Sequence, residues 1–152
     1  MKYCIKIFKV LMNIIYKFFK LFKTKNKITF ISRQSNKIGV DFKLLIEDIN
    51  KENPNTKIVV LNKELNKSII SKISYFFHMF VQMYHIATSK VVILDGYCIM
   101  ISILKHKKDL KVIQIWHALG SLKKFGYSTL GKKDGRDSKL AELMVIKTMI
   151  MY

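Results

Sequence analysis

One histidine of this sequence, His117, stands at a position where its side chain could take part in a reaction. His117 directly follows the only tryptophan, Trp116, at the end of the apolar run Lys111–Trp116. A histidine with an ordinary pKa near 6.5 can accept a proton from a hydroxyl group at neutral pH. His117 is therefore a candidate general base, and the alternative interpretation is a hydrogen-bonded structural histidine.

A basic turn with two glycines follows this histidine. Lys123 and Lys124 can hold a phosphate as point charges, and Gly120 and Gly126 allow the backbone to approach a ligand closely. The same lysines could equally belong to a solvated turn. The segment that ends at Tyr127 thus combines a candidate base with a candidate phosphate-binding turn.

Four short apolar runs must position these residues, and segments with helical spacing separate the runs. The runs are Ile28–Ile31, Lys57–Leu61, Val91–Leu94 and Lys111–Trp116. Apolar residues recur at three and four positions over Asp41–Asn50, about Ser68–Ala87 and around Tyr97–Leu104. This alternation predicts an α/β domain, a Rossmann-like parallel sheet flanked by helices on both faces.

Ligands bind beyond the carboxyl ends of the strands in such sheets. Asp95 follows the third run and His117 follows the fourth, so topology alone brings both to one edge. Both residues therefore lie where a sheet of this kind binds its ligands. Because no phosphate-binding glycine loop, no nucleophile elbow and no Cys/His cluster with zinc spacing occurs, we expect neither a metal nor a bound cofactor.

The first segment, residues 1–24, predicts a basic amphipathic helix. Its polar residues recur at every third or fourth position, which places them on one stripe: Lys2, Lys6, Lys9, Asn13, Lys17, Lys20 and Lys23. Large apolar residues lie on the opposite side: Ile5, Phe8, Met12, Ile15, Phe19 and Phe22. A basic stripe without any acid favours a helix that lies in a membrane interface. The alternative is a helix packed on the domain core.

The chain of 152 residues is strongly basic, with 28 Lys and Arg against 10 Asp and Glu and a formal charge of +18. Such a surplus predicts an anionic partner, and a membrane surface is the one we expect. A second interpretation is a non-enzymatic basic module that binds a membrane or nucleic acid. We expect no nucleic acid, because the lysines are dispersed, only Arg33 and Arg136 are arginines and no RNA-binding motif is present.

The segment Asp95–Tyr127 resembles the CDP-glycerol glycerophosphotransferase family, the teichoic acid polymerases and primases of Gram-positive bacteria. The resemblance rests on a Gln-x-Trp-His sequence at 114–117 and a Lys-Lys-x-Gly sequence at 123–126, and it extends over about residues 27–142. It implies that residues 27–152 form the amino-terminal, acceptor-side domain of a GT-B fold, truncated before the donor-binding domain. Ala118 stands where family members often have glycine.

The resemblance also implies the chemistry. His117 is expected to activate an acceptor hydroxyl, Asp95 to orient the histidine or the acceptor, and Lys123 and Lys124 to contact acceptor phosphate. The donor would be CDP-glycerol or CDP-ribitol, and the acceptor a lipid-linked teichoic acid. The location would be peripheral, at the cytoplasmic face of the cell membrane. A chain without the donor-binding domain is expected to be inactive alone.

Overall fold

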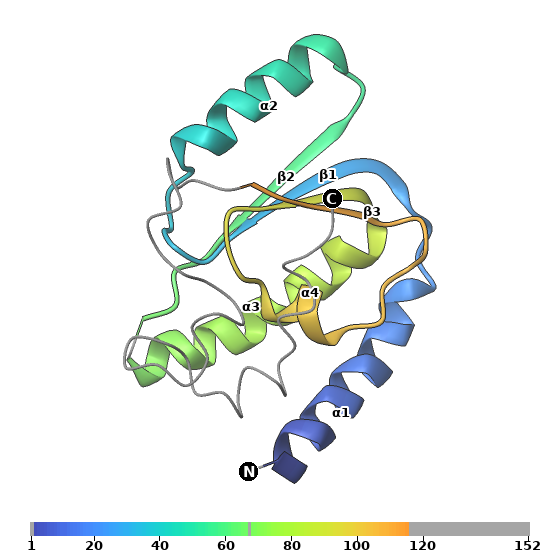
Figure 1. Cartoon of the computed structure of the whole chain (residues 1–152), viewed down its shortest axis with the longest axis vertical. Coiled ribbons are helices and arrows are strands. Elements are labelled where there is room, and N and C mark those ends of the chain that lie inside the picture. The colour runs from blue at the N-terminus through green and yellow to red at the C-terminus, as the bar shows by residue number, and fades with distance from the viewer. Residues whose placement is uncertain (1, 67, 116–152) are drawn as a thin grey trace, which may run out of the picture.

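The computed structural model describes residues 2–66 and 68–115, and it confirms the parallel sheet with helices on both faces (Figure 1). The strands are β1 (Lys25–Ser32), β2 (Lys57–Asn62), β3 (Ser89–Leu94) and β4 (Lys111–Gln114). The helices are α1 (Lys2–Lys20), α2 (Val40–Glu52), α3 (Ile69–Thr88) and α4 (Ile99–Ile103). Each helix and strand corresponds to one that the sequence predicts, and only its first and last residues differ from the prediction.

The sheet has the strand order β2-β1-β3-β4, and all neighbouring strands are parallel. Helix α2 connects β1 to β2, α3 passes back across β1 to reach β3, and α4 continues outward to β4. The direction of winding therefore reverses between β1 and β3. In doubly wound sheets a ligand crevice opens at this point, beyond the carboxyl ends of the strands.

Both faces of the sheet are covered, which explains why its strands are almost entirely apolar. On one face, Phe42 of α2 packs edge-on against Phe30 of β1 with ring centres 4.9 Å apart, and Ile93 of β3 completes this core. On the other face, α1, α3 and α4 enclose a larger core that includes Met83 and Val92, both 0 % exposed. Figure 1 shows α2 on one side of the sheet and the other three helices on the opposite side.

Helix α1 packs on this larger core. Met12 and Tyr16 are each 1 % exposed, and Phe8, Ile15 and Phe19 pack against the same cluster. For Phe8, Met12, Ile15 and Phe19 the alternative of packing on the domain core is therefore confirmed.

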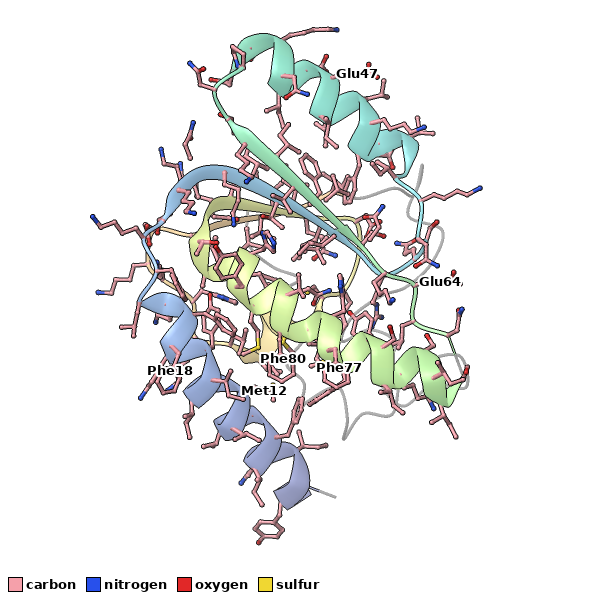
Figure 2. The ribbon with its side chains drawn as sticks, turned by 180° about the vertical axis from the view of Figure 1, so that it is seen from behind. Met12, Phe18, Glu47, Glu64, Phe77 and Phe80 are labelled. Carbon is pink, nitrogen blue, oxygen red and sulfur yellow. The ribbon has the colours of Figure 1, made fainter. Side chains whose placement is uncertain are left out.

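A second set of apolar side chains on α1 remains exposed. Its members point away from the core, as Phe18 does in Figure 2, whereas Met12 lies on the side toward α3. The set consists of Tyr3, Ile7, Val10, Leu11, Ile14 and Phe18. Within residues 2–66 and 68–115, none of the helices has the length and apolar character needed to cross a membrane.

Candidate functional site

The loops that follow β1 and β3 form the candidate site, because the winding reverses between these two strands. Arg33 and Gln34 follow β1, and Asp95 and Tyr97 belong to the loop after β3. The loops contact each other directly. Gln34 Nε2 donates a hydrogen bond to the backbone oxygen of Asp95 at 3.1 Å, and the guanidinium carbon of Arg33 lies 5.2 Å from the ring centre of Tyr97.

The side chain of Asp95 has unused hydrogen-bonding capacity. Its Oδ1 atom is buried and has no hydrogen-bond partner among the described residues. Leaving a buried acceptor without a donor costs about 1–3 kcal/mol, and more for a charged group. This oxygen is therefore suited to accept a hydrogen bond from a hydroxyl or N–H group that arrives at the sheet edge.

Gly96 allows the two loops to approach. A Cβ atom at this position would lie 3.2 Å from Nε2 of Gln34, which is closer than most Cβ contacts. Because the same Nε2 atom donates to the backbone of Asp95, any larger residue at position 96 would push on the contact that joins the loops. A methyl group at position 96 would therefore require the exposed end of the Gln34 side chain to shift.

Strand β2 adds a second buried acceptor to this edge. Asn62 Nδ2 donates to the backbone oxygen of Lys37 at 2.8 Å, while Asn62 Oδ1 is buried without a partner in the described part of the chain. The backbone N–H of Lys63 donates to the oxygen of Ser32 at 3.0 Å and extends the β1–β2 pairing past Asn62. Buried acceptors from β2 and β3 therefore flank the end of β1, where Arg33 supplies a cation.

Neutral polar side chains lie beneath the loops. Burial raises the pKa of Cys98 and of Tyr75, so both stay protonated at neutral pH. The Cys98 thiol lies 3.9 Å from Oε1 of Gln82 and is a poor nucleophile in this state. Burial, and then the charge of Lys63, lower the pKa of His78. The uncharged state of Cys98, Tyr75 and His78 is typical of residues that pack under loops, and it does not suit them to act as acids or bases in a reaction.

A family model described as CDP-Glycerol:Poly(glycerophosphate) glycerophosphotransferase matches residues 14–149, which include the whole sheet and both site loops. The chain belongs to this family.

Three curated relatives in the same family show how much is shared. The teichoic acid ribitol-phosphate primase of Bacillus spizizenii is 30 % identical over 127 residues, 84 % of this chain and 32 % of the relative. The teichoic acid poly(ribitol-phosphate) polymerase of that organism is 32 % identical over 126 residues, 82 % of this chain and 20 % of the relative. The teichoic acid glycerol-phosphate primase of Bacillus subtilis is 49 % identical over 49 residues, 32 % of this chain and 13 % of the relative. The chain thus spans about a third of the length of these relatives or less.

Asp95 is the one predicted site residue that falls in the described part of this glycerophosphotransferase-family chain. Ile115 donates its backbone N–H to the oxygen of Leu94 at 2.8 Å, so the chain runs beside the end of β3 to within two residues of His117 in sequence. The other predicted site residues lie outside the described residues: His117, Gly120, Lys123, Lys124 and Gly126.

Sequence reasoning does not single out Arg33 or Gln34. A signal for Arg33 exists, because it is one of two arginines in the chain and comes two positions after the end of a predicted strand. No such signal exists for Gln34, whose role depends on Asp95, 61 positions away in sequence. In the described ranges, no three His, Cys, Asp or Glu side chains are grouped so that they could hold a metal ion.

Proposed function

We propose that this chain forms the acceptor-side part of a polyol-phosphate transferase in teichoic acid synthesis. The observation that carries this proposal is the family match over residues 14–149. The names of the relatives, which are teichoic acid primases and polymerases, support the same pathway. The Rossmann-like sheet agrees with one half of a GT-B fold, in which a second domain would bind the donor.

The proposed reaction moves glycerol phosphate or ribitol phosphate from CDP-glycerol or CDP-ribitol to a hydroxyl of a lipid-linked acceptor. The hydroxyl oxygen forms a bond to the β-phosphorus of the donor. The bond from that phosphorus to the bridging oxygen breaks, and CMP leaves with both bonding electrons. His117 would accept the proton of the attacking hydroxyl, as expected from the Gln-x-Trp-His sequence. The CDP-polyol is a substrate in this proposal, and no cofactor is needed.

Asp95 would position the reacting groups through its unpaired Oδ1 atom, which can accept a hydrogen bond from the hydroxyl or from the imidazole. Arg33 at the same edge, together with Lys123 and Lys124, would neutralise phosphate charge. Phosphoryl transfer depends largely on positioning and on stabilising charge, so a site with these groups suits the reaction.

We further propose that the protein acts at the cytoplasmic face of the cell membrane as a peripheral protein. A lipid-linked acceptor would be found there. The basic stripe and the exposed apolar side chains of α1 support attachment to an anionic membrane surface.

A chimaera tests the catalytic part of this proposal. In the chimaera, this chain replaces the aligned segment of the Bacillus spizizenii ribitol-phosphate primase. We expect it to release CMP when supplied with a CDP-polyol and a primed acceptor. His117→Ala should lower kcat at least 100-fold, since a positioned general base contributes roughly 10²–10⁴-fold.

The matched control is Lys90→Ala, at an exposed position near the amino end of β3 and so at the opposite edge of the sheet, which should leave turnover unchanged. Full activity of the His117→Ala chimaera would remove His117 from the mechanism. We expect the 152-residue chain alone to release no CMP, and detectable release would show that it does not depend on a separate donor domain.

A further inference from the structure

Helix α1 carries a basic groove beside its exposed apolar side chains. The groove has a volume of about 480 Å³ and lies between α1 and the loop that follows α4. Five lysines line it: Lys6, Lys9, Lys17, Lys20 and Lys105. We refer to it as the α1 groove.

Among the described residues, no acidic side chain lines the α1 groove. The one ion pair within residues 2–66 and 68–115 joins Lys51 and Asp48 on α2, on the opposite side of the sheet. Within the described ranges, no carboxylate therefore neutralises the positive charges of the groove. A cluster of lysines in this arrangement attracts an anion with several negatively charged oxygens.

Hydrogen bonds hold the wall of the groove in place. Asn13 Nδ2 donates to the backbone oxygens of Lys9, at 2.8 Å, and Ile103, at 2.9 Å. Asn13 Oδ1 accepts the backbone N–H of Lys105 at 2.8 Å, and Lys20 Nζ donates to the backbone oxygen of Lys105 at 3.2 Å. The lysines from α1 and the single lysine from the loop are thus held on either side of the same hollow.

The groove is apolar as well as basic. Val10 and Ile14 line it, and both also belong to the exposed apolar set of α1, with exposed fractions of 60 % and 49 %. Ile7 and Phe18, at 67 % and 66 %, continue this set along the helix. A ligand that carries a phosphate next to a hydrocarbon chain would use both kinds of surface, whereas a free phosphate or a nucleic acid backbone would leave the apolar residues in water.

We propose that the α1 groove binds the phosphate of an anionic phospholipid in a bilayer, while Ile7, Val10, Ile14 and Phe18 enter the acyl-chain boundary. The inference rests on the proposed membrane location and deepens it. It names the surface that binds, and it gives α1 one face for the core and a different face for the lipid.

Vesicle co-sedimentation of the full chain tests the groove. We expect binding to vesicles of phosphatidylcholine with one third phosphatidylglycerol, and much weaker binding to phosphatidylcholine alone. Lys6→Gln with Lys17→Gln should weaken binding roughly 25-fold, since each basic residue near an anionic surface contributes about fivefold. Both side chains are exposed, so the fold should be kept, as circular dichroism can verify.

A control of equal charge is Lys43→Gln with Lys90→Gln, on exposed positions outside the groove. It should weaken vesicle binding less than threefold. Equal losses for the two pairs would overturn the proposal, because general charge attraction would then explain the binding. The proposal would also be overturned if wild-type protein fails to bind these vesicles, or if soluble glycerol phosphate at millimolar concentration displaces it from them.

Ile14→Ser with Phe18→Ser separates the bilayer from a soluble anion, because only insertion requires these side chains. We expect at least a tenfold loss of vesicle binding, and unchanged binding would contradict insertion. The catalytic proposal is measured independently as CMP release by the chimaera on a soluble acceptor. Failure of the groove would leave that activity intact, and failure of His117 as the base would leave vesicle binding intact.

Discussion

Lys27 is a lysine in the interior of the sheet, and its protonation should control part of the stability of the fold. Only 3 % of the surface of Lys27 is exposed to solvent. The Nζ atom donates to Thr88 Oγ1 at 2.6 Å, lies 3.2 Å from Nδ1 of His85, and is 5.4 Å from the centre of the Tyr84 ring. The surroundings are thus polar and aromatic, without a carboxylate contact among the described residues.

The pKa values of this pair follow from their burial. Loss of hydration, followed by repulsion from Lys25 and Lys57, lowers the pKa of Lys27 from 10.5 to about 8. Burial, and then the charge of Lys27, lower the pKa of His85 to about 4. At neutral pH the imidazole is therefore uncharged and can accept a hydrogen bond from the Lys27 ammonium group.

The sign of the pH effect follows from proton linkage. Between pH 8 and pH 10.5 the unfolded chain holds more protons on Lys27 than the folded chain does, so the free energy of unfolding rises with pH in this window. Below pH 8 both states are protonated, and burying the charge costs at most roughly 3 kcal/mol. Integration from pH 7 to pH 9.5 gives a gain of about 2 kcal/mol for the wild-type protein.

We predict that Lys27→Met removes this dependence. Urea denaturation of the 152-residue chain, followed by circular dichroism between pH 7 and pH 9.5, measures the free energy of unfolding of both proteins. The difference in the free energy of unfolding between the two proteins should shift by about 2 kcal/mol in favour of the wild type as pH rises, because the two proteins differ only at this side chain. Lys90→Met, at an exposed position of β3, should give a constant difference. A constant difference for Lys27→Met would refute the reasoning.

Two further predictions concern contacts that join distant parts of the chain. Asn13→Ala leaves the backbone oxygen of Ile103 and the N–H of Lys105 without their partners, so urea denaturation should show a free energy of unfolding lower by about 2 kcal/mol. The control Asn50→Ala, on the exposed surface of α2, should change the free energy of unfolding by less than about 0.5 kcal/mol. Gly96→Ala should lower the turnover of the chimaera a few-fold, because the added methyl group presses on the end of the Gln34 side chain that donates to the backbone of Asp95. Wild-type turnover would mean that this contact does not position the site.

The order of helices and strands follows from the sequence because each element has a clear period. Lys57–Asn62 and Ser89–Leu94 are short β-branched runs, and Ile69–Thr88 repeats apolar residues at three and four positions. Since parallel strands end at the same edge of a sheet, the position of Asp95 could also be predicted. The partners of Asp95 could not, because they depend on which strands are neighbours.

Helix α1 shows where period alone is insufficient. Its apolar residues cover two faces of the helix, one with Met12 and Phe19 and another with Val10 and Phe18, and the lysine stripe borders both. Hydropathy does not distinguish these faces. Contacts with other helices determine which face of α1 is buried, since the Phe19 ring lies 6.2 Å, centre to centre, from the Tyr84 ring of α3. The prediction of a basic amphipathic helix is confirmed, but its core-facing side could only be identified from the fold.

The α1 groove and the candidate site come from different elements, so their contributions to the proposed function are physically separable. The groove belongs to α1 and the loop at Lys105, while the site belongs to the loops at Arg33 and Asp95. Attachment to a bilayer concentrates an enzyme near a lipid-linked acceptor, which lowers the apparent KM without changing the barrier to phosphoryl transfer. Loss of a group that contacts the reacting atoms lowers kcat instead. Loss of the Lys6 and Lys17 charges should therefore appear only with an acceptor embedded in a membrane, whereas loss of His117 should appear with any acceptor.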